Sequence, residues 1–196
     1  MPMSNAPDTL IAVILAGGRA TRMGGSDKGW IPLRGKPLIC HVQERLAPQV
    51  DGLLINANRN LARYQALAPV VSDTLGDYPG PLAGMLAGLE AATSEWVLFV
   101  PCDTPFLPRD LVSRLQAART PECEVVVAHD GEWLQPVVAL VKRSLRGSLA
   151  ATLAAGERRI DRWYARHTMV LADFSDCPHA FDNLNSPDEL ARHDSN

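Results

Sequence analysis

Short apolar segments alternate with helix-like segments along the whole chain, and this alternation restricts the possible folds more than any other feature of the sequence. The segments with strand character are residues 10–15, 52–56, 70–72, 96–100, 124–128, 135–141 and 169–172. Several of them are almost wholly apolar, as is typical of strands buried on both faces of a parallel sheet. Segments with helical character lie at residues 37–47, 61–66, 82–92, 108–119, 144–155 and 187–193. We therefore predict an α/β fold, a three-layer sandwich in which helices cover both faces of a mostly parallel sheet.

The sequence contains no feature that would divide the chain into separate domains. Its 196 residues are within the usual size of one domain. No Ser/Gly-rich linker, internal repeat or low-complexity stretch interrupts it. We expect a single domain over residues 1–196, with residues 1–8 flexible ahead of the first strand.

Composition excludes several classes of protein. Hydrophobic residues make up 46% and charged residues 21%, which excludes a disordered or collagen-like chain. The 19 basic and 22 acidic residues give a net charge of −3, so no positive field points to nucleic acid. The apolar run at residues 10–16 is too short to span a membrane. A secretory signal has basic residues before its apolar segment, and no Lys or Arg precedes this run. We expect a protein that binds neither nucleic acid nor membranes.

The cysteines indicate a reducing compartment. Cys40, Cys102, Cys123 and Cys177 form no C-x-x-C pair, and none stands at zinc-finger spacing from a histidine. We interpret them as reduced thiols of a cytoplasmic protein, without a role in zinc binding, disulfides or thiol catalysis.

The most informative segment is residues 15–28, which read LAGGRATRMGGSDK. It directly follows the first strand, where open α/β sheets place their ligand crevices. Glycines allow backbone N–H groups to approach phosphate oxygens, and Arg19, Arg22 and Lys28 add positive charge. A flexible glycine-rich turn would also account for the bare pattern.

Two common phosphate-binding motifs are excluded by spacing. G-x-G-x-x-G needs two glycines two positions apart, and no pair in the chain has that spacing. Walker A needs a glycine five positions before a Gly-Lys pair, but Trp30 stands five before Gly35-Lys36. The loop is therefore neither a dinucleotide fingerprint nor a P-loop.

The pattern L-A-G-G-x-x-x-R-M-G-G-x-D-K resembles the signature loop of nucleotidyltransferases. Its Asp27-Lys28 ending is similar to the branch of the molybdenum cofactor guanylyltransferases, because relatives acting on sugar phosphates usually have Pro before that lysine. The resemblance implies a Rossmann-like sheet of the nucleotide-diphospho-sugar transferase type. It also implies that Leu15, Ala16, Gly17 and Lys28 bind the nucleotide, with Arg22 and Lys28 catalytic.

Further blocks match the same family in the same order. Asn56 and Asp73 end the second and third predicted strands, and the resemblance implies that they contact the guanine nucleotide. A turn role at strand ends would also account for them. Gly80, Gly84 and Gly88 form a smooth strip, which we interpret as close packing of a helix on the sheet, while Gly80 could also leave room for a base or pterin.

Asp103 follows the apolar strand 96–100 and lies between Pro101 and Pro105. A carboxylate at the carboxyl end of a strand is well placed to bind Mg²⁺. The resemblance implies that Asp103 is a nucleotide-binding, catalytic residue and the metal ligand.

The acceptor side is less distinctive. The resemblance assigns Arg158, Arg159, Asn183 and Asn185 to the acceptor side. Arg158 and Arg159 would bind the molybdopterin phosphate, for which guanidinium groups are suited, and Asn183 and Asn185 could assist the acceptor or the metal. Solvated surface charge would also account for the arginines. Asn185 could instead be a turn residue before the helix that Ser186 caps.

The activity implied is transfer of GMP from GTP to the phosphate of Mo-molybdopterin, with Mg²⁺ as cofactor and pyrophosphate as the second product. An ionised phosphate nucleophile needs no general base, so catalysis rests on positioning and charge neutralisation. The implied partners are GTP, Mo-molybdopterin and proteins that insert the molybdenum cofactor, and the chain is expected to be a monomer.

Three other functions are compatible with the sequence. A related enzyme could use CTP with molybdopterin, or a nucleoside triphosphate with a sugar phosphate. A nucleotide-sensing module without catalysis could keep the fold, although it would have less need of both Lys28 and Asp103.

Overall fold

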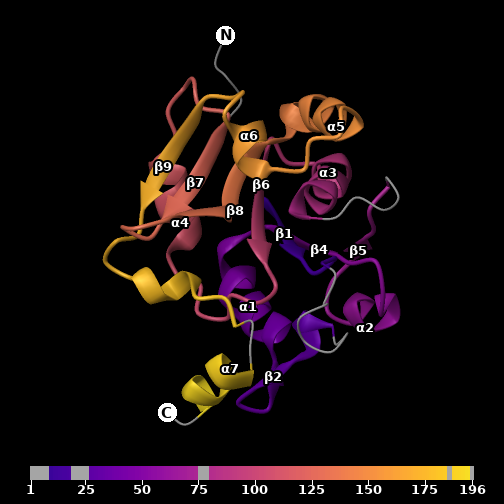
Figure 1. Cartoon of the computed structure of the whole chain (residues 1–196), viewed down its shortest axis with the longest axis vertical. Helices are drawn as coiled ribbons and strands as arrows, with labels where there is room; N and C mark the ends of the chain where they lie inside the picture. The colour runs from indigo at the N-terminus through magenta and orange to yellow at the C-terminus, as the bar shows by residue number, and fades with distance from the viewer. Residues whose placement is uncertain (1–8, 19–26, 75–79, 185–186, 195–196) are drawn as a thin grey trace.

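A seven-stranded sheet forms the centre of the computed structural model, which describes residues 9–18, 27–74, 80–184 and 187–194 (Figure 1). Its strands are β1 (Ile11–Leu15), β4 (Gly52–Asn56), β5 (Val70–Val71), β6 (Trp96–Pro101), β7 (Val125–His129), β8 (Leu134–Lys142) and β9 (Met169–Asp173). The strand order is β5-β4-β1-β6-β8-β7-β9, and β8 alone runs antiparallel to its two neighbours. The prediction of a mostly parallel sheet is confirmed.

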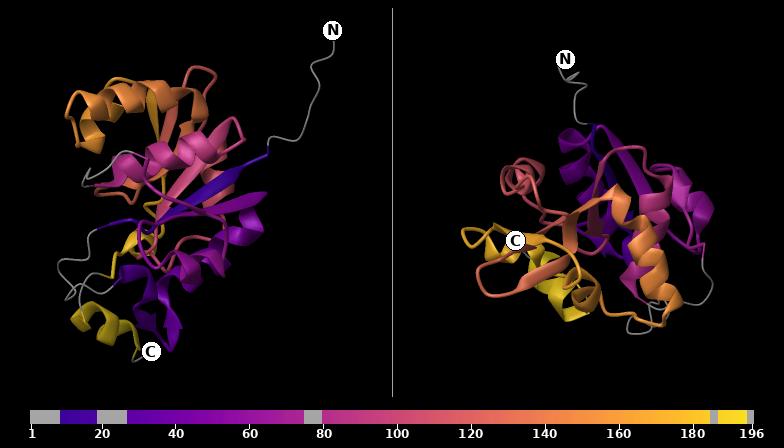
Figure 2. Two further views of the ribbon diagram at one scale, coloured as in Figure 1. Left: turned by 90° about the vertical axis from the view of Figure 1, so that its right-hand side faces the viewer. Right: turned by 90° about the horizontal axis from the view of Figure 1, so that it is seen from above.

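The helices cover both faces of this sheet, which gives three layers (Figure 2). They are α1 (Leu38–Leu46), α2 (Leu61–Gln65), α3 (Pro81–Ala91), α4 (Leu111–Ala117), α5 (Arg146–Ala154), α6 (Ile160–Tyr164) and α7 (Pro187–Asp194). Helices α1, α2 and α4 pack on one face, and α3, α5 and α6 pack on the other.

The apolar strands follow from this arrangement. Successive side chains of a strand point to opposite faces, so both sets of positions in a central strand must be apolar. In β6, Leu98 and Val100 belong to the first core, whereas Val97 and Phe99 belong to the second.

Some short elements were not expected from the sequence. The hairpin β2 (Pro32–Leu33) and β3 (Lys36–Pro37) turns at Arg34 and Gly35, whose φ values of 51° and 74° suit a tight hairpin turn. Helix α6 was also missed, because its five residues are too few to show a helical period. The described residues also contain single-turn 3₁₀ helices: η2 (Lys28–Trp30), η3 (Ala47–Gln49), η4 (Arg143–Leu145) and η5 (Pro178–Phe181).

The two ends of the chain are described only in part. The expected flexible segment, residues 1–8, and the expected cap Ser186 lie outside the described residues. Pro187 begins α7, and Leu190 of this helix packs with Leu33, Leu38 and Leu184 in a small separate core.

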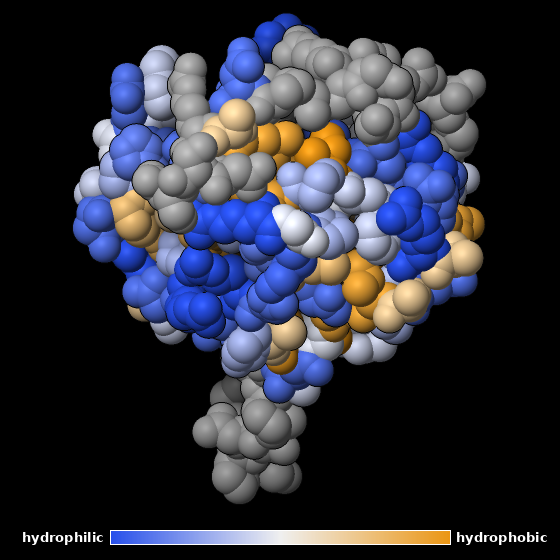
Figure 3. Space-filling model, turned by 90° about the horizontal axis from the view of Figure 1, so that it is seen from below, coloured by the Kyte–Doolittle hydropathy of each residue, from blue (hydrophilic) through white to orange (hydrophobic). Residues whose placement is uncertain are grey.

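None of the helices in the described ranges is long and apolar enough to cross a lipid bilayer. The face in Figure 3 is mostly polar, and its apolar side chains occur in small groups.

Helix α3 packs closely on the sheet at two glycines. A Cβ atom at Gly88 would lie 2.7 Å from Phe99 Cε1 and 3.0 Å from Val13 Cγ2, and one at Gly84 would overlap Asn56 Oδ1. The interpretation of the glycine strip as a packing surface is therefore confirmed for these two positions.

Gly88→Ala should lower the free energy of unfolding by about 1–3 kcal/mol, the usual cost of overpacking a well-filled core. Gly147→Ala in α5 is the matched control, because no other atom lies within 4 Å of the added Cβ. That control should leave stability unchanged or raise it by up to about 1 kcal/mol, since Ala favours a helix over Gly. Urea denaturation of both variants measures the difference, and equal effects would contradict the packing at Gly88.

Candidate active site

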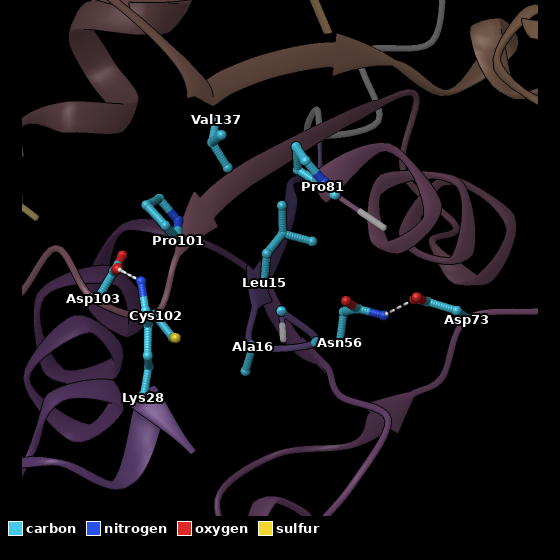
Figure 4. A pocket seen from close by; sticks show the side chains of 13 residues that line it. Leu15, Ala16, Lys28, Asn56, Asp73, Pro81, Pro101, Cys102, Asp103 and Val137 are labelled. Atoms are coloured by element: carbon cyan, nitrogen blue, oxygen red, sulfur yellow. Dashed lines mark hydrogen bonds and ion pairs between the residues drawn. The ribbon is translucent and has the colours of Figure 1, made fainter. Parts of the chain in front are cut away.

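A cavity of about 420 Å³ opens at the edge of the sheet where β1, β4 and β6 end (Figure 4). These strands are parallel and in register, with Leu15 paired to Asn56 on one side and to Pro101 on the other. The cavity is lined by Leu15, Ala16, Gly17, Gly18, Lys28, Asn56, Asp73, Gly80, Pro81, Pro101, Cys102, Asp103 and Val137. Its volume is typical of a small-molecule site, roughly 300–1,000 Å³.

One end of the cavity carries an ion pair. Lys28 opens η2 and Asp103 follows β6, and the Lys28 Nζ atom lies 3.3 Å from Asp103 Oδ2. The Asp103 side chain is 11% exposed and that of Lys28 is 32% exposed, so the pair is partly shielded from water. This end can attract an anion through Lys28 and a cation through Asp103.

A carboxamide and a carboxylate lie at the opposite end. Asn56 is 2% exposed, and its Nδ2 donates to Asp73 Oδ1 over 2.8 Å and to the Val71 carbonyl over 3.2 Å. Because carboxylate and carbonyl oxygens only accept, the amide nitrogen must face them. The Asn56 Oδ1 atom therefore points the other way, toward Gly17 and Gly84.

An apolar surface joins the two polar ends. It consists of Leu15, Pro81, Pro101 and Val137, which surround the middle of the cavity in Figure 4. Val137 reaches this position through an irregularity in β8, whose pairing with β7 jumps from Gln135 to Ala139. Such bulges turn a side chain out of its regular direction.

Cys102 lines the cavity between the ion pair and β1. Burial raises the pKa of its thiol, and the neighbouring Asp103 carboxylate adds to that shift. Lys28 lowers the pKa of this thiol, but burial and the carboxylates of Asp103 and Asp27 outweigh it, so the thiol is neutral near pH 7 and is not activated as a nucleophile. All four cysteines are free thiols.

Helix α2 and the residues before it hold the backbone next to Lys28. Asp27 accepts hydrogen bonds from Asn60 Nδ2, at 2.9 Å, and from the Tyr64 hydroxyl. Burial and the contact with Asp27 raise the pKa of Tyr64, so its hydroxyl stays a donor. Gly29 lies directly under that hydroxyl, where a Cβ atom would come within 2.6 Å of it.

The structure gathers seven of the sequence-predicted residues around one cavity: Leu15, Ala16, Gly17, Lys28, Asn56, Asp73 and Asp103. Gly80 also lines it, at a φ of 106° that favours glycine. Arg22 lies outside the described residues.

Of the residues predicted for acceptor binding, the three that the structure describes, Arg158, Arg159 and Asn183, are not among those that line the cavity. The Arg158 guanidinium donates to the Leu153 and Glu157 carbonyls, each at 2.9 Å, and Arg159 forms an ion pair with Asp161 at 2.6 Å. Asn183 is exposed and precedes Leu184, whose N–H donates to the Asp103 carbonyl. Asn185 lies outside the described residues.

Sequence reasoning missed several residues of the cavity. Pro81, Pro101 and Cys102 stand next to motif residues, and that proximity was the available signal. No sequence signal indicated Val137, because its position at the cavity depends on the irregular pairing of β8.

The oxygen ligands at Asp103 suit a hard divalent cation that is shared with a substrate. Such a cation is often held by one or two carboxylates together with phosphate oxygens. Within the described ranges, no three His, Cys, Asp or Glu side chains gather to enclose a metal ion by themselves.

Known proteins resemble this chain in sequence. Residues 12–170 match the family model of the MobA-like NTP transferase domain. A molybdenum cofactor guanylyltransferase of Vibrio cholerae is 54% identical over 92% of this chain and 89% of its own length. Another, from Shewanella loihica, is 54% identical over 91% of this chain and 92% of its own length.

Solved structures share the fold. The molybdopterin-guanine dinucleotide biosynthesis protein A of Archaeoglobus fulgidus superposes with a TM-score of 0.79 at 23% identity, over 95% of this chain and 97% of that one. The sequence matches show that the chain belongs to the MobA-like NTP transferase family, among the molybdenum cofactor guanylyltransferases, and the shared fold agrees with this.

Proposed function

We propose that the protein transfers GMP from GTP to the phosphate of Mo-molybdopterin and releases pyrophosphate. The observation that carries the choice of nucleotide is the pair Asn56 and Asp73. With the Asn56 Nδ2 atom committed to Asp73 and Val71, these two side chains can offer a base only oxygen acceptors.

Guanine fits this acceptor-only end of the cavity better than cytosine or adenine does. Its N1–H and N2–H₂ groups are two adjacent donors on one edge, so a carboxylate can accept from both. Cytosine and adenine each present an amino donor beside a ring-nitrogen acceptor, which would face an oxygen of Asp73 unfavourably. This favours GTP over the CTP alternative.

In the proposed reaction, an oxygen of the acceptor phosphate attacks the α-phosphorus of GTP. A new phosphorus–oxygen bond forms while the bond from the α-phosphorus to the β-phosphate oxygen breaks, and pyrophosphate leaves with its electron pair. Lys28 would bind the phosphates and stabilise the charge on the leaving group. Arg158, Arg159, Asn183 and Asn185 stay predictions for the acceptor side, and Arg22 stays one for the triphosphate.

Asp103 would hold Mg²⁺, which supplies positive charge beside the triphosphate when it is bound. Lys28, which would bind the phosphates, lies 3.3 Å from this carboxylate and supports the proposal. A pure nucleotide sensor has less need of such a paired arrangement.

We further propose that the chain acts as one domain, because strands from residue 11 to residue 173 share one sheet. A monomeric state, a cytoplasmic location and contact with proteins that insert the molybdenum cofactor stay predictions.

A nucleotide panel tests the proposed function. Pyrophosphate release should be measured with molybdopterin as acceptor and GTP, CTP or ATP as donor, in the presence of Mg²⁺. We expect release with GTP to exceed release with CTP and ATP by at least about tenfold. Equal or faster release with CTP would favour the cytidylyltransferase alternative, and no release with any donor would favour a binding module.

Lys28→Ala should lower turnover by roughly 10²–10³-fold, the effect of losing one preorganised contact to developing charge. Folding should persist, since the side chain is one-third exposed. Lys36→Ala is the control, because Lys36 pairs with Glu44 on the surface, away from the cavity. A Lys28→Ala variant within a few-fold of the wild-type rate would show that Lys28 does not act on the reacting phosphates.

Asp103→Asn should lower turnover by at least ~10²-fold, because an amide lacks the negative charge that a hard cation prefers. GTP should still bind, since Lys28 and the base end remain. A Mg²⁺ titration of pyrophosphate release should show only partial recovery at high Mg²⁺, with Asp110→Asn on the exposed surface as the unaffected control. Superimposable curves for Asp103→Asn and the wild type would exclude Asp103 as the metal ligand.

A further inference from the structure

Asn58 holds Asp73 through both its side chain and its backbone. The Asn58 Nδ2 atom donates to Asp73 Oδ2 over 2.9 Å, and the Asp73 N–H donates to Asn58 Oδ1 over 2.9 Å. The same Nδ2 atom lies 3.4 Å from the Gly17 carbonyl of the glycine loop. Asn58 is exposed and does not line the cavity, so these contacts serve Asp73 and the loop.

Two amides therefore share the Asp73 carboxylate. Asn56 donates to Oδ1 at 2.8 Å, and Asn58 donates to Oδ2. Each carboxylate oxygen has about two lone-pair directions. As far as the described residues occupy them, one direction on each oxygen is thus left for a ligand, and the two amides together fix the plane of the carboxylate.

The two asparagines that donate to Asp73 differ in their surroundings. Asn56 is buried, and its amide is confined between Gly17, Gly84 and the Asp73 carboxylate. It also lines the cavity, so its removal would change the ligand contacts directly. Asn58 can be removed without changing the lining, which makes its effect on Asp73 separable.

We infer that Asn58 is a positioning residue that sets base selectivity, by fixing Asp73 so that both carboxylate oxygens accept from one base. This inference rests on the proposed function, with guanine as the base. Without Asn58 the carboxylate can rotate about its side-chain bonds and meet one donor at a time. The exocyclic 2-amino group then contributes less to binding.

Comparing GTP with inosine triphosphate isolates this effect, because inosine triphosphate lacks only the 2-amino group. Dissociation constants should be measured by calorimetry with Mg²⁺ and without acceptor. The wild type should bind GTP about 10- to 100-fold more tightly, as expected for a hydrogen bond to a charged group. In Asn58→Ala, GTP binding should weaken about tenfold and inosine triphosphate binding by less than about threefold, so that the ratio falls.

Asn60→Gly is the matched control. Asn60 also donates its amide to a carboxylate, that of Asp27, and its φ of 51° suits glycine. Asp27 is next to Lys28, so this variant should weaken the binding of GTP and of inosine triphosphate by the same factor. The ratio of their dissociation constants should stay the same. Asn58→Asp provides a second test in case Asn58→Ala does not fold, as thermal unfolding would reveal. It keeps the size of the side chain but turns a negative charge toward Asp73, and it should lower the ratio as well.

An unchanged ratio of the two dissociation constants in a folded Asn58→Ala or Asn58→Asp variant would overturn the inference. A purely structural role of Asn58 would weaken the binding of both nucleotides by the same factor. A wild type that binds CTP as tightly as GTP would overturn the proposed function, and the inference with it. That result would be visible before any variant is compared.

Discussion

No side chain larger than hydrogen fits at position 84 while α3 keeps its distance from the sheet. A Cβ atom there would overlap Asn56 Oδ1 and lie 3.1 Å from Leu15 Cδ2. Gly17 confines the same Asn56 oxygen from the other side, where a Cβ atom would come within 2.8 Å of it. The amide nitrogen then has one direction left, toward Asp73. A packing constraint between a helix and a sheet thus sets the orientation of a polar group in the site.

The sheet topology explains why the two polar ends share one cavity. Strands β1, β4 and β6 are adjacent and parallel, so the residues that follow them meet at one edge. Asn56 ends β4, and Asp103 comes two residues after β6. Lys28 and Asp103 compensate each other's charge at 3.3 Å, which lowers the cost of keeping a carboxylate largely out of water. The apolar surface between the ends suits the uncharged part of a nucleotide.

Much of this could be predicted from the sequence, and the failures have physical reasons. The strands were recognisable because burial on both faces requires apolar runs such as WVLFV. The residues that line the cavity were largely recognisable because they follow those strands and match a family signature. The hairpin at Arg34-Gly35 lacks the common Asn-Gly turn, and α6 is too short for periodicity. Val137 and the bond from Asn58 to Asp73 depend on tertiary pairing, which no local pattern encodes.

The central claim is that one end of the cavity binds the base and the other binds the phosphates. Calorimetry with GMP and GTP tests it directly, because the two ligands share the base and differ in the β- and γ-phosphates. Asp73→Ala should weaken the binding of both ligands by a similar factor, about tenfold or more. Lys28→Ala should weaken the binding of GTP about tenfold or more and that of GMP much less. Equal weakening of GMP and GTP by Lys28→Ala, or GMP binding untouched by Asp73→Ala, would contradict the account.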